Sequence, residues 1–100
     1  MCQIKSITII GRRWRQKVYG NTYNSVQIFV DTTEIKLPYE YGGMDQYYQR
    51  AISYLVENGY IIPENNESIR DWAKRNGVNM VSVVVDVARK KDLFRTQEVI

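Results

Sequence analysis

Basic and aromatic side chains alternate in the stretch IIGRRWRQKVYGNTY, which runs from Ile9 to Tyr23 and contains no acidic residue. Single-stranded nucleic acid is bound by cations that follow the phosphates and by aromatic rings on which bases stack. The pattern therefore predicts a nucleic-acid-binding surface. The candidate residues are the cations Arg12, Arg13, Arg15 and Lys17 and the rings of Trp14, Tyr19 and Tyr23. The alternative is that Trp14 anchors the core inside a solvated rim of arginines, because tryptophan is highly buried on average.

A second basic cluster follows a run of valines near the end of the chain and consists of Arg89, Lys90 and Lys91. A run of charged residues after a strand is usually a solvent-exposed segment where the chain leaves the sheet. The cluster joins the predicted nucleic-acid surface if the last strand pairs with the first, because the two basic segments would then be neighbours.

The middle of the chain is acidic and rich in tyrosine. Residues 31–68 hold seven acidic and two basic residues, whereas residues 1–30 hold five basic residues and no acidic one. Tyrosine is favoured at protein interfaces because it buries a large area at low entropic cost. The middle segment therefore predicts a docking face for a basic protein, with the candidates Tyr39, Tyr41, Tyr47 and Tyr54. The alternative is that most of these rings belong to the core.

Catalytic chemistry has little support in the composition. The chain contains no histidine, which excludes the triads and zinc sites that need an imidazole, and its single cysteine, Cys2, excludes an internal disulfide and a cysteine-only zinc site. Asp31, Glu34 and Lys36 resemble the acid and lysine arrangement of metal-dependent nucleases. Their spacing differs from that pattern, however, and we interpret them as surface charge. The sequence predicts a protein that is not an enzyme and holds no metal or other cofactor.

Hydrophobic alternation predicts a long hairpin in the first third. Residues 3–10 are rich in β-branched side chains and are predicted to form a strand. Gly11 is predicted to be a bulge or bend, and the strand continues beyond it. The tip of the hairpin is predicted at Gly20-Asn21, and the chain returns through residues 22–30. A loop of about a dozen residues is the alternative.

Two further strands are predicted. Residues 34–41 form an edge strand, because Pro38 cannot donate a hydrogen bond to a ladder. Residues 78–88 are apolar on nearly both faces, which is typical of a strand inside a sheet.

Two helices lie between these strands. The first begins near Met44 and ends at Asn58-Gly59, and the second is capped by Asn66 or Ser68 and ends at Asn76-Gly77. The chain is thus expected to form a single domain over residues 1–100. Its fold class is α+β, with two layers: a mostly antiparallel β-sheet in the order β-β-β-α-α-β and two helices packed on one face. The helices should cover Val26, Ile28, Ile35 and Leu37, and leave Phe29 and the basic hairpin on the open side or rim.

Several segments together resemble a group of small proteins encoded in phages and prophages: IIGRRW, YGNTY with NSVQIFV, PYEYGGMDQYY, ENGYI and VVVDVARKKDL. The resemblance covers most of the chain and carries no catalytic residue over. It implies a mobile-element origin and a bacterial cytoplasm. It also implies either nucleic-acid binding or the inhibition of a host protein.

The sequence therefore predicts a non-enzymatic binding protein that holds nucleic acid through the basic and aromatic hairpin. The alternative is a phage-encoded accessory or inhibitor protein that binds a host bacterial protein through the tyrosine-rich acidic face. No apolar run is long enough to cross a membrane, so no membrane partner is expected.

Overall fold

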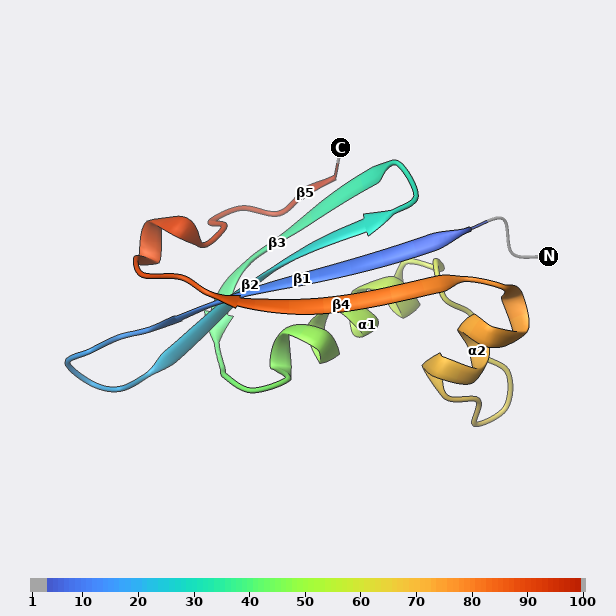
Figure 1. Cartoon of the computed structure of the whole chain (residues 1–100), viewed down its shortest axis with the longest axis horizontal. Helices are drawn as coiled ribbons and strands as arrows, with labels where there is room; N and C mark the ends of the chain where they lie inside the picture. Colours follow the sequence, from blue (N-terminus) through green and yellow to red (C-terminus); the bar gives the residue numbers. More distant parts are fainter. Residues whose placement is uncertain (1–3, 100) are drawn as a thin grey trace.

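A five-stranded sheet with two helices on one side forms the protein in the computed structural model, which describes residues 4–99 (Figure 1). The elements are β1 (Ser6–Arg15), β2 (Thr22–Val30), β3 (Thr33–Tyr41), α1 (Gln46–Glu57), α2 (Ile69–Asn76), β4 (Asn79–Asp86), the short 3-10 helix η1 (Lys90–Asp92) and β5 (Glu98–Val99). Strands β1, β2, β3 and β5 pair antiparallel in the sheet order β4-β1-β2-β3-β5, and β4 runs parallel to β1. The predicted α+β class and element order are confirmed, except that β5 was not predicted. Cys2 lies outside the described residues.

The long hairpin is confirmed, but its predicted tip is wrong. Strands β1 and β2 stay in register from Ile7 opposite Val30 to Arg15 opposite Thr22. The connecting loop is wider than a two-residue turn, because the Gln16 amide donates to the Asn21 carbonyl at 2.7 Å and the Gly20 amide donates to the Gln16 carbonyl at 2.8 Å. Gly20 has a φ of +71°, which a residue without a side chain adopts readily. The tip is therefore residues 17–20, and we call residues 11–24 the arm.

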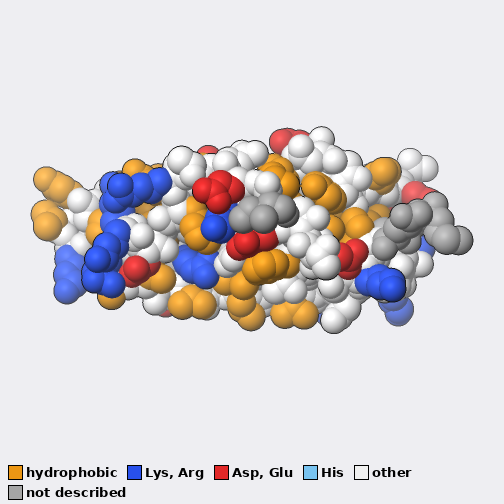
Figure 2. Space-filling view, turned by 90° about the horizontal axis from the view of Figure 1, so that it is seen from above, with side chains coloured by type: hydrophobic (Ala, Val, Ile, Leu, Met, Phe, Trp, Pro, Cys, Tyr) orange, Lys and Arg blue, Asp and Glu red, His pale blue; other side chains and the backbone are white. Residues whose placement is uncertain are grey.

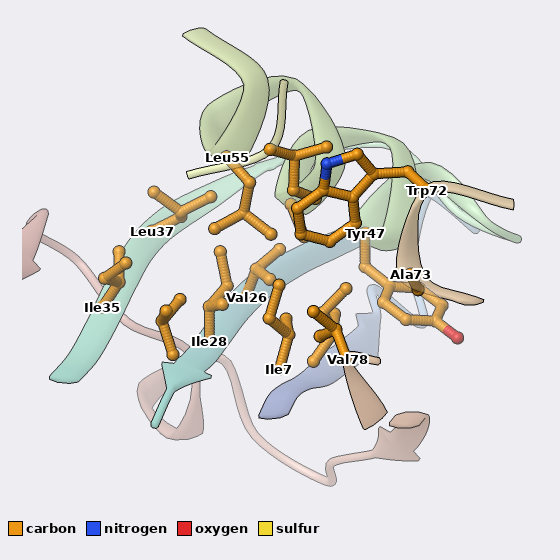
Figure 3. Close-up of a cluster of buried hydrophobic side chains, with 14 residues drawn as sticks. Ile7, Val26, Ile28, Ile35, Leu37, Tyr47, Leu55, Trp72, Ala73 and Val78 are labelled. Atoms are coloured by element: carbon orange, nitrogen blue, oxygen red, sulfur yellow. The ribbon is translucent and has the colours of Figure 1, made fainter. Parts of the chain in front are cut away.

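The core lies between one face of the sheet and the helices. Alternate residues of β1, β2 and β3 point toward Leu55 of α1 and Trp72 of α2, as Figure 3 shows for Ile7, Ile28 and Ile35. These side chains are buried together with Val26 and Leu37, so the predicted helix-covered face is confirmed. Each such aliphatic side chain contributes about 1.5–3 kcal/mol when fully buried.

Gly11 is neither a bulge nor a bend, because it lies in regular register opposite Val26. The Tyr47 ring of α1 packs directly on this position. A Cβ atom at Gly11 would lie 2.4 Å from two atoms of that ring. The glycine therefore serves a close approach of helix to sheet, which also buries Tyr47.

The helix ends are formed as predicted. The Ser68 hydroxyl accepts a hydrogen bond from the Asp71 amide at 3.1 Å and caps α2. Gly77 takes the left-handed conformation after α2, so that the Val78 amide donates to the Ala73 carbonyl at 2.8 Å. The Tyr60 amide likewise donates to the Leu55 carbonyl after α1. No helix among the described residues is long and apolar enough to cross a membrane.

The two edges of the sheet differ from prediction. Strand β4 was predicted inside the sheet, yet it is the outermost strand and nearly all of it is exposed. Its valines fit an extended strand, but α1 packs on β1 and β2 and leaves β4 largely uncovered. Strand β3 was predicted at an edge, whereas β5 pairs with its outer side, although only at Ile35 and Lys36. Pro38 lies where the register between β2 and β3 shifts.

The chain after β4 crosses the sheet face opposite the helices, which we call the open face. Figure 1 shows η1 and β5 on this side. Leu93 is buried there, and the Tyr39 amide donates to the Phe94 carbonyl at 2.8 Å. Residues 87–97, the C-terminal segment, therefore connect β4 to the far edge and cover part of the open face.

Candidate functional site

Four aromatic side chains meet on the open face at the base of the arm. Trp14 and Tyr23 are paired across the hairpin, and their rings stack with centroids 5.8 Å apart and planes inclined by 29°. Tyr39 and Tyr41 of β3 contact Tyr23 edge-on at 6.2 and 5.7 Å. Trp14 is only half-buried and Tyr41 is 65% exposed. We call these four residues the ring cluster.

The composition of the ring cluster was not predicted. Tyr39 and Tyr41 were assigned to a protein-docking face, but the structure places them beside Trp14 and Tyr23. The reason is the register shift between β2 and β3, which sets Tyr41 opposite Tyr23. Tyr19 lies apart from the cluster, exposed in the loop at the tip of the arm.

Cations of the C-terminal segment and of the arm adjoin the ring cluster. The Lys90 ammonium lies 4.9 Å from the centre of the Tyr39 ring. Arg12 donates to the Gln27 amide oxygen at 2.9 Å, and its guanidinium lies 5.0 Å from the centre of the Phe94 ring. Because β4 pairs with β1, the Arg89–Lys91 cluster does lie next to the arm, as the conditional prediction stated.

The remaining arm cations point to the other face. Strand alternation places Arg13 and Arg15 opposite in direction to Arg12 and Trp14. Together with Lys17 they line a groove of about 610 Å³, which is also lined by the loop before α1 and by the end of β4. Arg13 is held by Asp86, with 3.0 Å between Nε and Oδ1. Cations therefore occupy both faces of the arm, whereas the ring cluster occupies one.

The arm end of the molecule is strongly positive. Residues 11–24 and 86–92 together contain seven basic and two acidic side chains, a net charge of +5, while the whole chain carries +3. Figure 2 shows Lys and Arg side chains gathered at this end of the molecule on the face in view. Only Arg13 and Arg89 have a carboxylate within 4.0 Å, at Asp86 and Asp92. Within the described residues, five cations form no ion pair: Arg12, Arg15, Lys17, Lys90 and Lys91.

A polar network anchors the base of the arm to α1. The Arg50 guanidinium donates to the Asn24 backbone and side-chain oxygens at 3.0 Å each and to the Pro38 carbonyl at 2.5 Å. Burial lowers the pKa of Arg50, and the neighbouring Glu40 carboxylate, 3.1 Å away, opposes that shift. Asn24 also donates to the Gln46 side chain at 2.8 Å. Since Asn24 belongs to β2, these bonds fix where the arm leaves the sheet.

The predicted protein-docking tyrosines do not form one face. Tyr47 is buried against Gly11 and is therefore not available to a partner, which corrects that assignment. Tyr54 lies on α1, on the other side of the sheet from Tyr39 and Tyr41, and is half-buried. Desolvation raises the pKa of the Tyr54 phenol.

The acid and lysine residues that resemble a nuclease site do not converge. The Asp31 carboxylate accepts hydrogen bonds from the amides of Lys5 and Ser6, and Glu34 accepts one from Gln27. Lys36 lies 3.6 Å from Glu98. Within residues 4–99, no group of three or more histidine, cysteine or acidic side chains is placed to hold a metal ion.

Comparisons of the chain with protein-family models, with curated proteins and with solved structures found no match. The resemblance to phage proteins therefore stays a prediction, and function is inferred from the residues of this chain.

Proposed function

We propose that the chain is a non-enzymatic protein that binds single-stranded nucleic acid at the arm end. The observation that carries this proposal is the meeting of two basic segments, distant in sequence, around a half-exposed ring cluster. The resemblance to phage and prophage proteins adds the proposed setting, a bacterial cytoplasm.

The rings are suited to bases that are not already stacked in a duplex. Trp14 and Tyr41 offer partly exposed rings on an open sheet face, and stacking tolerates any base because every base has a π-face. Tyr23 packs between them and supports both. A duplex would present its backbone rather than its base faces to such a cluster.

The five cations without a carboxylate partner are suited to phosphates. Lys90 lies over the Tyr39 ring of the cluster, and Arg12 lies over Phe94 on the same face of β1 as Trp14, so phosphates next to a stacked base come within their reach. Arg15 and Lys17 add positive charge on the other face of the arm, where they line the groove. Because no carboxylate within the described residues neutralises these five side chains, binding releases counterions without first breaking an internal ion pair.

Fluorescence anisotropy with a labelled single-stranded oligonucleotide, compared with the same sequence as a duplex, tests the proposal. Tyr41→Ala should weaken single-strand binding by about 1–3 kcal/mol, the worth of one stacked base. Tyr19→Ala is the matched control, because that ring is also exposed but lies outside the cluster. Equal losses in the two variants, or no binding at low salt, would contradict the proposal.

Stacking on Trp14 has its own readout. Trp72 is buried in the core, so a Trp72→Phe background leaves Trp14 as the only indole of the chain. Addition of the oligonucleotide should quench its fluorescence in this background. Unchanged emission at saturating oligonucleotide would remove Trp14 from the interface.

A second candidate is an accessory or inhibitor protein that binds a host bacterial protein. The observation that favours it is the exposure of large apolar side chains at the arm end, at Val18, Tyr19, Tyr41 and Met44. Such side chains beside a positive surface suit an acidic protein groove. A pull-down from bacterial lysate with and without nuclease separates the two candidates, since a protein partner survives the nuclease.

A further inference from the structure

Strand β4 presents to solvent a row of backbone groups that no strand of the described chain pairs. The Asn79 amide donates to the Lys5 carbonyl and the Val87 amide donates to the Arg13 carbonyl, so the odd-numbered residues of β4 bond to β1. By alternation, the amides and carbonyls of the even-numbered residues 80–86 point away from the sheet. The ladder with β1 is regular over the whole strand, so no bulge turns this edge aside.

Before Asp86, the side chains of β4 do nothing to protect the edge. Natural sheets blunt their edges with lysine, proline, bulges or very short strands. Residues 79–85 contain no charge and no proline, and Val81, Val83 and Val85 are 45%, 45% and 48% exposed on the open face. The opposite edge, in contrast, is formed by the two-residue strand β5, which carries the Lys36–Glu98 ion pair. Within residues 4–99, β4 is thus the longer unpaired edge of the sheet.

We propose that β4 pairs antiparallel with β4 of a second copy of the chain, to form a two-fold dimer with a continuous sheet. The pairing centres on Val83, which faces Val83 of the second copy. Val81 then faces Val85 of the second copy, so that all three exposed valines of the open face find a valine partner. A shift by two residues toward the N-terminus would place Val85 opposite Asn79.

The even-numbered residues complete the pairing. In this register Ser82 and Val84 exchange backbone hydrogen bonds with Val84 and Ser82 of the second copy, because their amides and carbonyls already point outward. Asp86 faces Met80 of the second copy, so no like charges lie directly opposite each other. The exposed apolar residues of β4 therefore match each other when two copies of the strand pair antiparallel. This self-complementarity favours a second copy of the chain as the partner.

Charge also favours this antiparallel arrangement. The arm extends beyond one end of β4, and the net charge of +5 is concentrated there. Antiparallel pairing places the two arms at opposite ends of the dimer, so the two positive ends stay apart. A parallel arrangement would bring them together.

The mass of the full chain in solution, measured by light scattering after size exclusion, tests the proposal. We expect twice the 11.8 kDa of the monomer. Val83→Lys should return the monomer mass, because it sets two like charges face to face at the two-fold axis. Val99→Lys is the matched control, since this valine is 54% exposed on the opposite edge, and its mass should stay that of the dimer.

Val84→Pro tests the backbone hydrogen bonds between the two copies of β4 without introducing a charged side chain. It removes an amide that points outward and leaves the ladder to β1 intact, so the chain should fold, by circular dichroism, as a monomer. A wild-type mass of 11.8 kDa up to the solubility limit, an open-ended series of larger species, or a dimer that survives both substitutions would overturn the proposal.

Cross-linking tests the register. In a Cys2→Ser background, Val83→Cys should form a disulfide-linked dimer on oxidation, because the two Cβ atoms of such a pair lie about 4.5–5.5 Å apart. Val81→Cys alone should not cross-link, whereas Val81→Cys with Val85→Cys should. Faster cross-linking by Val81→Cys than by Val83→Cys would overturn the register.

Discussion

Removal of Arg15 and Lys17 gives the sharpest test of how the arm end binds nucleic acid. Both side chains are exposed and neither forms an ion pair with a described residue, so the double variant Arg15→Gln/Lys17→Gln should fold like the wild type. Each phosphate contact on a single strand contributes about 0.7 to the slope of log K against log salt concentration. Five cations without a carboxylate partner therefore allow a slope of up to about 3.5, and the double variant should lose about 1.4 of it.

The assay is an anisotropy titration of one labelled single strand at several salt concentrations. Arg70→Gln/Lys74→Gln is the matched control, because it removes the same charge from exposed positions of α2, at the end of the molecule far from the arm (Figure 1). The control should weaken binding slightly through the long-range field and leave the slope unchanged. An equal loss of slope in the two double variants would show that net charge, and not contact with the arm, drives binding.

The fold itself yields three further predictions. Gly11→Ala should cost about 1–3 kcal/mol in urea unfolding, because its Cβ would lie 2.4 Å from the Tyr47 ring, and Tyr47→Leu should relieve part of that cost. Arg50→Met should cost about 1–3 kcal/mol in the same assay, since it leaves the Asn24 and Pro38 carbonyls without their donor. The hydrogen bonds from Arg75 hold the pKa of Glu67 below the ordinary value of 4.5, so their contribution to stability is complete above that pH and is lost as the pH falls through the lowered pKa. The difference in urea midpoint between the wild type and Glu67→Gln should therefore shrink on acidification, and a constant difference would contradict this assignment.

Local signals were sufficient for the helices and for the two strands of the hairpin, although not for its tip. Asn58-Gly59 and Asn76-Gly77 marked the helix ends correctly because a left-handed residue after a helix is decided by the residue itself. The alternation in β2 and β3 likewise identified the buried face, since a period of two is a property of a single strand.

Neighbour relations could not be predicted from such local patterns. The valines of β4 indicate a strand but not how many strands flank it, and the predicted interior position was wrong for that reason. Leu93 is buried although its surroundings have no period, because its burial comes from the path of the C-terminal segment across the open face. The ring cluster depends on the register shift between β2 and β3, which no spacing in the sequence records.

The two proposals together predict how binding depends on the length of the single-stranded oligonucleotide. A two-fold axis perpendicular to the sheet keeps both open faces on the same side, so the dimer would present two ring clusters to one strand, with the arms at opposite ends. The longest dimension of one molecule is 48 Å. An oligonucleotide long enough to reach both arms gains affinity, because the first contact raises the effective concentration for the second. Val84→Pro, which adds no charge, should therefore weaken binding of a long oligonucleotide and leave that of a short one unchanged. Equal weakening of both would mean that the substitution disturbs the binding site itself, because loss of a second contact cannot affect an oligonucleotide that reaches only one arm.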